Sequence, residues 1–166
     1  MKGNPTMIES TQCFICRNDE ILMMYRNKKA KDPNEGKWVG IGGKVEKNES
    51  ASEANVREVK EETGILLSEQ ECRFCGVVYF KNTVWNDEKI YLYLANVDGS
   101  IQFSDCDEGE LHWIDKDRIL SLNLWEGDRI FLEPLLKGKT GIEITLYYEG
   151  DRLMRVENQA PGSPDQ

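Results

Sequence analysis

The alternation of apolar and polar positions along the chain predicts a series of short β-strands. The predicted strands are residues 10–17, 20–26, 77–81, 90–97, 101–103, 111–114, 142–148 and 151–157. Turn residues separate the first two strands, at Asn18-Asp19, and the last two, at Glu149-Gly150. Each of these two pairs should therefore form a hairpin.

Other stretches favour helices. The main one begins at Ser50, which forms a capping box with Glu53, and stops at Gly64, the residue type expected just past a helix end. A short helix is predicted over residues 115–122 and a longer one over residues 125–137, with Pro134 as a kink or an end. Strands on both sides of a helix, with a second long helix late in the chain, predict an α+β or mixed α/β layered domain.

The length of 166 residues is suited to one domain with a buried core. We expect this domain to span residues 1–157. The last nine residues, N-Q-A-P-G-S-P-D-Q at 158–166, are predicted to be a disordered tail.

The charge balance restricts the partners. With 30 acidic and 21 basic side chains the net charge is −9, which disfavours binding to duplex nucleic acid. A small polyphosphate can still bind if a metal ion neutralises the site. No segment approaches the roughly 18 apolar residues of a membrane span, and the N-terminus lacks a hydrophobic signal core. We therefore expect a cytoplasmic protein with no membrane partner.

Four of the five cysteines form two C-x-x-C pairs, Cys13 with Cys16 and Cys72 with Cys75. Such pairs suggest zinc. The first pair lies in a predicted strand, however, where positions three apart face opposite sides of the sheet and cannot share a metal. We expect the cysteines to be neither zinc ligands nor disulfides, but small buried side chains.

The acidic residues of the main helix form a second pattern. Glu58, Glu61 and Glu62 are three and four positions apart, so their carboxylates gather on one side of the helix, where they repel each other. They follow a loop with glycines at Gly42 and Gly43, and carboxylate and carbonyl oxygens are the ligands that Mg²⁺ prefers. Spacing alone leaves two interpretations open, a metal site or a solvated acidic helix face.

The complete stretch resembles the Nudix box, G-x5-E-x7-R-E-U-x-E-E-x-G-U, in which U is a bulky aliphatic residue. The nine residues that fill its defined positions are Gly43, Glu49, Arg57, Glu58, Val59, Glu61, Glu62, Gly64 and Ile65. The resemblance implies a Nudix hydrolase, which cleaves a nucleoside diphosphate linked to another group with a divalent metal. It also implies the fold, an α/β/α sandwich with a mixed β-sheet between two main helices.

The flanking sequences G-K-W-V-G-I-G-G-K-V, D-E-G-E-L-H-W-I and W-E-G-D are similar to MutT-type purine nucleoside triphosphate diphosphatases. This similarity implies Mg²⁺ as the cofactor, with Mn²⁺ as a substitute. The implied metal ligands, which are also the implied catalytic residues apart from the glycine, are Glu58, Glu61, Glu62, Glu108 and the carbonyl of Gly42. Glu58 or Glu108 would act as the general base, and Glu110 is the alternative to Glu108. The structural positions of the box are Gly43, Glu49, Arg57 and Gly64.

The same similarity implies substrate contacts outside the box. Trp125 would stack on the base and Asp128 would bond its polar edge, while Arg26 and Lys44 would lie near the nucleotide. The alternative is a core role for Trp125 and a helix-cap role for Asp128. The chain also departs from the mammalian members of the group, because Val39 replaces an Asn and Gly127 replaces an acid, which leaves the preferred base open.

The resemblance therefore implies hydrolysis of oxidised purine nucleoside triphosphates such as 8-oxo-dGTP to a nucleoside monophosphate and pyrophosphate. The only implied partner is this small nucleotide, and the sequence does not indicate the oligomeric state. One alternative is a Nudix hydrolase of another nucleoside diphosphate derivative, although no proline lies between Pro33 and Pro134, which disfavours the ADP-ribose branch. The other is a non-catalytic nucleotide-binding module, which the intact box disfavours.

Overall fold

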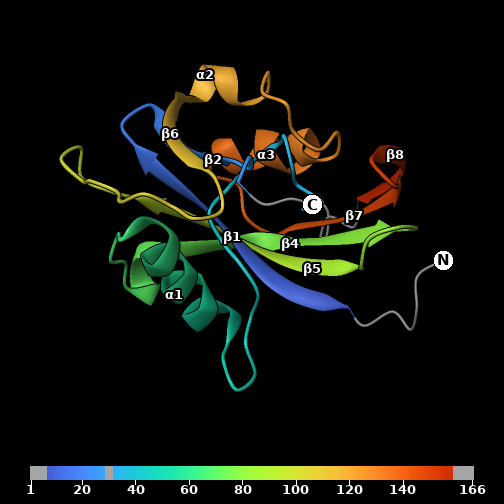
Figure 1. The fold of residues 1–166 in the computed structure, drawn as a ribbon, viewed down its shortest axis with the longest axis horizontal. Coiled ribbons are helices and arrows are strands. Elements are labelled where there is room, and N and C mark those ends of the chain that lie inside the picture. The colour runs from blue at the N-terminus through green and yellow to red at the C-terminus, as the bar shows by residue number, and fades with distance from the viewer. Residues whose placement is uncertain (1–6, 29–31, 159–166) are drawn as a thin grey trace.

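The computed structural model describes residues 7–28 and 32–158, and its chain path is drawn in Figure 1. The strands are β1 (Ile8–Arg17), β2 (Glu20–Tyr25), β3 (Trp38–Val39), β4 (Cys72–Asn82), β5 (Glu88–Asn96), β6 (Glu110–Asp115), β7 (Ile142–Glu149) and β8 (Arg152–Asn158). The helices are α1 (Ala51–Thr63), α2 (Lys116–Ile119), α3 (Asp128–Leu136) and the 3₁₀ turn η1 (Glu69–Glu71). In the part of the chain that the structure describes, no helix is long and apolar enough to cross a membrane.

The described strands form one mixed sheet in the order β3-β2-β1-β5-β4-β7-β8, and β6, outside this order, pairs antiparallel with β2. Hairpins join β1 to β2, β4 to β5 and β7 to β8 in antiparallel pairs, as predicted for the first and last of these. The pairs β1–β5 and β4–β7 are parallel. The register of β1 with β5 places Ile8 opposite Glu88.

The helices lie on opposite faces of the sheet, with α1 below and α3 above in Figure 1. Two separate buried clusters show the same arrangement. Val59 of α1 packs in one cluster, and Phe131 and Leu135 of α3 pack in the other. The predicted fold class, a mixed sheet between two main helices, is confirmed.

Strand β1 contributes to both clusters because its side chains alternate between the two faces. Cys13 and Ile15 lie in the cluster under α1, whereas Phe14 and Cys16 lie in the cluster under α3. Cys13 and Cys16 are thus buried on opposite sides of the sheet, and all five cysteines are free thiols. A shared metal between these two side chains is excluded by their orientation.

Helix α1 begins and ends where its caps predict. The Ser50 hydroxyl accepts the Glu53 N–H at 3.0 Å, and the Glu53 carboxylate accepts the Ser50 N–H at 2.8 Å. Gly64 ends the helix in the left-handed region, with φ of 78°.

Three predicted elements differ from the structure. Residues 101–103 are not a strand: their apolar side chains pack on the cluster under α1, and no strand pairs with them. The predicted helix at 115–122 is limited to α2. The helix predicted from residue 125 begins only at Asp128, because the preceding residues form a turn in which the Asp128 N–H bonds the Trp125 carbonyl at 2.9 Å.

The C-terminal part of the chain differs from the prediction at Pro134 and at the end of the last strand. Pro134 lies inside α3 and does not end it. Asn158 is the last residue of β8, and residues 159–166 of the predicted tail lie outside the described residues.

Candidate active site

The glycine loop before α1 runs against β1 as an additional strand-like segment. Ile41 exchanges both backbone hydrogen bonds with Cys13, at 2.6 and 3.0 Å, and the Thr11 N–H bonds the Gly43 carbonyl at 2.9 Å. A Cβ at Gly42 would overlap the carbonyl oxygen of Thr11. Only glycine therefore fits at this position, because the loop backbone lies directly against β1.

Gly43 is similarly constrained, since a Cβ there would overlap the carboxyl group of Glu58. Replacing Gly43 with Ala should displace this carboxylate and lower kcat on the order of 10²-fold, as misplacement of a reacting group by about 1 Å does. The measurement is kcat together with a melting curve. Gly99→Ala is the matched control, because a Cβ at this loop position would meet only the Asn18 side chain, at 3.4 Å. Normal kcat for Gly43→Ala would show that the position of Glu58 does not matter.

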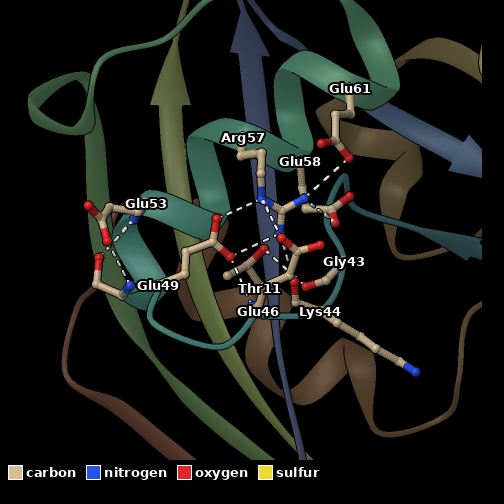
Figure 2. Close-up of polar contacts among 10 residues, drawn as sticks. Thr11, Gly43, Lys44, Glu46, Glu49, Glu53, Arg57, Glu58 and Glu61 are labelled. Atoms are coloured by element: carbon tan, nitrogen blue, oxygen red, sulfur yellow. Dashed lines mark hydrogen bonds and ion pairs between the residues drawn. The ribbon is translucent and has the colours of Figure 1, made fainter.

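Arg57 joins the loop to the helix, as Figure 2 shows. Its guanidinium donates to both oxygens of Glu49, at 2.6 and 3.0 Å, and to the carbonyl of Lys44 at 2.9 Å. It also contacts Glu58 at 3.0 Å and Glu61 at 3.2 Å. Arg57 thus holds Glu58 from one side and ties the loop before the helix to α1.

The structure brings Glu58, Glu62 and Glu108 together. Burial raises the pKa of Glu62 to about 8, and the negative charges of Glu108 and Glu58 add to the effect. Burial also raises the pKa of Glu58, against the opposing effect of Arg57. The Glu62 side chain is 6 % exposed, and its Oε1 has no hydrogen-bond partner in the described part of the chain.

Glu61 lies apart from this cluster, at its exposed side. Its side chain is 57 % exposed and contacts the Arg57 guanidinium, while Glu62 points inward from the next position. Of the box glutamates, Glu58 and Glu62 are therefore the pair that faces the buried side of the site.

The acidic loop after β5 supplies Glu108 rather than Glu110. Glu108 forms an ion pair with Arg26 at 3.0 Å, and its charge acts on Glu62. Glu110 instead accepts a hydrogen bond from Asn27 at 2.7 Å and lies beside His112. Glu108 thus lies in the carboxylate cluster, whereas Glu110 lies at the surface.

A divalent cation fits this arrangement when bound together with a ligand. No group of three or more His, Cys, Asp or Glu side chains in residues 7–28 and 32–158 is arranged to hold a metal ion on its own. The unpartnered oxygen of Glu62 and the repulsion among Glu58, Glu62 and Glu108 would both be relieved by a cation. Water, substrate phosphates and the Gly42 carbonyl would complete its coordination, as is common for Mg²⁺.

A cavity of about 380 Å³ adjoins the glycine loop, and its size is in the range of small-molecule sites. Among the residues that line it are Arg26, Gly42, Gly43, Lys44, Phe80, Trp85, Glu88, Trp125 and Asp128. Of these, Gly43 adjoins Glu58 and Arg26 pairs with Glu108, whereas Asp128 is the first residue of α3 and Glu88 the first residue of β5. The structure thus brings the four predicted substrate-contact residues to one cavity. In Figure 2 the Lys44 side chain points away from the carboxylates.

Trp125 is both a core residue and a wall of the cavity. It is 5 % exposed and makes edge contacts with Phe80 and Tyr148, with ring centroids 5.1 and 4.9 Å apart. Its indole N–H donates to Asn34 at 2.7 Å, and the Lys37 ammonium lies 4.5 Å from the ring centroid. The two interpretations of this residue from the sequence are therefore not exclusive.

Asp128 is the first residue of α3, and Gly127 is the N-cap, with no side-chain hydrogen bond closing the helix end. The helix-cap interpretation of Asp128 is therefore wrong. Burial raises the pKa of the Asp128 carboxyl to about 7, with Glu88 adding to the rise and Arg129 and Lys37 opposing it. A carboxyl with such a pKa can accept or donate a hydrogen bond near neutral pH.

This pKa predicts a pH-dependent gain in stability for Asp128→Asn. The pKa of an Asp in the unfolded chain is near 3.9, whereas that of folded Asp128 is about 7. Between these two pH values the folded state binds a proton that the unfolded state has released. The free energy of unfolding therefore falls as pH rises from about 3.9 through about 7. Asn should therefore raise the melting temperature little at pH 4 and most above pH 7. Melting curves across this range measure the effect, with Glu133→Gln on the same helix as the control. A gain that does not change with pH would contradict the assignment.

Sequence reasoning missed several residues of the cavity. Asp32, which bonds Arg26 at 2.7 Å, and Asn34 lie in a loop whose sequence shows only turn residues. Glu88 begins β5 after a polar stretch and looks like an ordinary exposed acid. The local sequence does not identify these residues as part of a site. They line the cavity because β1 pairs with β5 and because the loop lies beside the cavity.

An α/β/α sandwich with clustered carboxylates, a constrained glycine loop and an adjoining cavity with two cationic side chains is suited to metal-assisted hydrolysis of phosphate anhydrides. A family model described as NUDIX domain matches residues 8–135. The chain belongs to this family, the Nudix hydrolases, which are enzymes that act on pyrophosphate bonds and generally use divalent metal ions. The membership implied by the box is therefore confirmed.

Individual relatives are similar over most of the chain. The uncharacterized Nudix hydrolase YvcI of Bacillus subtilis is 27 % identical over 140 residues, covering 83 % of this chain and 85 % of the relative. The oxidized purine nucleoside triphosphate hydrolase of Danio rerio is 29 % identical over 105 residues, covering 63 % of this chain and 65 % of the relative. The crystal structure of the MutT protein of Bacillus halodurans has a TM-score of 0.81 at 23 % identity and covers 94 % of this chain and all of that chain, which shows the shared fold.

Proposed function

We propose that this Nudix hydrolase is a purine nucleoside triphosphate diphosphatase that prefers oxidised bases such as 8-oxo-dGTP and releases a nucleoside monophosphate and pyrophosphate. One observation carries the proposal: a single cavity is lined by an aromatic ring, Trp125, and a carboxyl, Asp128, together with the glycine loop and Arg26, which adjoin the carboxylates of Glu58 and Glu108. A nucleotide bound there would place its base against Trp125 and Asp128 and its phosphates toward the carboxylates. The relative in Danio rerio supports this substrate class.

The base end is suited to an oxidised purine. Trp125 offers an aromatic surface for stacking, and Asp128 offers a carboxyl that exists in both protonation states near pH 7. Oxidation at C8 turns the N7 acceptor of guanine into an N–H donor, which an ionised carboxylate can accept. The unmodified base presents an acceptor on that edge, which would need the protonated form.

The phosphate end is suited to a metal-bound triphosphate. Glu58, Glu62, Glu108 and the Gly42 carbonyl would hold Mg²⁺ or Mn²⁺, which when bound neutralises phosphate charge and lowers the pKa of a water. Arg26 and Lys44 would contact phosphate oxygens, because both line the cavity beside the glycine loop. Glu58, oriented by Arg57, or Glu108, oriented by Arg26, would accept the proton of the attacking water.

The test is a panel of substrates with Mg²⁺ and with Mn²⁺, comprising 8-oxo-dGTP, the four ordinary deoxynucleoside triphosphates and ADP-ribose. Chromatography separates pyrophosphate from phosphate among the products. We expect pyrophosphate and the highest kcat/KM for 8-oxo-dGTP. Faster cleavage of ADP-ribose would favour another nucleoside diphosphate derivative, and binding without turnover on any substrate would favour a non-catalytic module.

A further inference from the structure

A second carboxyl group, that of Glu88, lines the same cavity as Asp128. Glu88 is the first residue of β5 and lies opposite Ile8 of β1. Asp128 reaches the cavity from a different element, the first turn of α3. Asp32, the third acidic residue of the lining, is paired with Arg26 at 2.7 Å. Glu88 and Asp128 thus face one cavity from separate elements, an arrangement that a ligand with hydrogen-bond donors for both would stabilise.

The Glu88 side chain is held in a defined position. The Ser10 hydroxyl donates a hydrogen bond to its Oε2, which orients the carboxylate from the neighbouring strand. Its Oε1 has no hydrogen bond or ion pair within residues 7–28 and 32–158. The nearest cations, Lys44 and Arg26, act on Glu88 only through longer-range attraction. One oxygen of this carboxylate is thus oriented and available.

Asp128 is also available, because the cations around it have other partners. Arg129 donates to the carbonyls of Leu120 and Leu122, at 2.8 and 3.0 Å. Lys37 lies over the Trp125 ring. In the described part of the chain the Asp128 carboxyl forms no hydrogen bond and no ion pair, so both Asp128 and Glu88 offer a carboxyl oxygen to a ligand in the cavity.

We propose that Glu88 is a specificity-determining residue that accepts N–H donors from one edge of the base while Asp128 meets another edge. This inference rests on the proposed function and extends it to a base that carries donors on two edges. A guanine-type base has N1–H and an exocyclic amine on one edge, and oxidation at C8 adds N7–H on the other. Thymine has a single N–H donor, and hypoxanthine lacks the amine.

Discrimination follows from the cost of an unpaired acceptor. A base without a matching donor leaves a desolvated carboxylate without a hydrogen-bond partner, and this lost pairing is more costly for a charged group than for a neutral one. Sites built to bond a donor reject analogues without one more strongly than apolar pockets reject differences in size. Glu88 would therefore contribute to specificity mainly by weakening the binding of bases that lack a matching donor.

The test compares kcat/KM of Glu88→Gln and the wild type on 8-oxo-dGTP, dGTP, dITP and dTTP. Gln keeps the volume but replaces one acceptor oxygen with a donor amide. We expect the preference for 8-oxo-dGTP over dTTP to fall at least tenfold, through KM more than kcat. Glu143→Gln, on β7 and absent from the cavity lining, should leave the ratio unchanged. An equal fall for every base would overturn the assignment and reduce Glu88 to a positioning role.

A binding measurement separates this inference from the proposed function. Trp85 and Trp125 both line the cavity, so their fluorescence can report the binding of nucleoside monophosphates without turnover. If the wild type cleaves no triphosphate, the proposed function fails. The Glu88 inference still predicts tighter binding of 8-oxo-dGMP than of dTMP, and loss of that difference in Glu88→Gln. An unchanged difference in the variant, or none in the wild type, would overturn it, provided that melting curves show a folded variant.

Discussion

Replacing Glu62 with Gln should lower kcat by about 10²–10⁴-fold and at the same time raise the melting temperature of the metal-free protein. The loss of activity follows from removing a charged oxygen from the cluster that would hold the metal. The gain in stability follows from the pKa of about 8. An unfolded Glu titrates near 4.3, so ionised Glu62 destabilises the folded state increasingly from that pH through about 8.

The loss of activity is measured as kcat with saturating Mg²⁺. The gain in stability is measured from melting curves in the presence of a chelator, from pH 5 to pH 9. The gain in melting temperature should be largest above pH 8. Glu58→Gln should lower kcat to a similar extent but gain less stability, because it also loses the charge attraction between Glu58 and Arg57, which lie 3.0 Å apart. Near-normal turnover in either variant would contradict the metal assignment. Glu133→Gln, an exposed position on α3, should change neither quantity.

Replacing Trp125 with Ala should lower the free energy of unfolding by about 3–5 kcal/mol, the usual loss for a large buried aromatic side chain. Trp125 is 5 % exposed and packs between Phe80 and Tyr148. The same change removes the stacking surface of the cavity, and base–aromatic stacking is worth about 1–3 kcal/mol per base. We therefore expect a less stable protein with weaker base discrimination.

Urea unfolding measures the first effect, and kcat/KM for several nucleotides at a temperature where the variant is folded measures the second. Trp125→Phe keeps a ring and should retain much of both. Asp128→Ala distinguishes base binding from core packing. It should reduce kcat/KM for the preferred purine by about 10–10²-fold, without the large loss of stability expected for Trp125→Ala. Equal losses on every base in both variants would assign Trp125 and Asp128 to the core alone.

The box helix could be predicted from sequence because its signals are local. Ser50, Glu53 and Gly64 determine where α1 begins and ends through contacts within a few residues. The hairpins of β1 with β2 and of β7 with β8 could also be predicted, because a short turn joins the two strands of each pair. The grouping of Glu58 with Glu62 follows from helical geometry for the same reason.

Features that depend on distant parts of the chain could not be predicted in this way. The apolar pattern of residues 101–103 reflects packing beside α1, where the Ser104 N–H bonds the Thr63 carbonyl at 2.7 Å, and not pairing with a strand. Trp125 lies in the turn before α3, and its indole N–H donates to Asn34, a residue far earlier in the sequence. Glu88 belongs to the site only through the register of β1 with β5.

That parallel pairing also has a consequence for how the protein reaches its active state. Contacts between residues far apart in sequence form slowly, because the intervening loop must close first. The β1–β2 hairpin and helix α1 can form early from local contacts, whereas the pairing of Ile8 with Glu88 must wait for most of the chain. We therefore expect the part of the cavity lined by Ser10, Glu88 and the glycine loop to form late in folding, after helix α1.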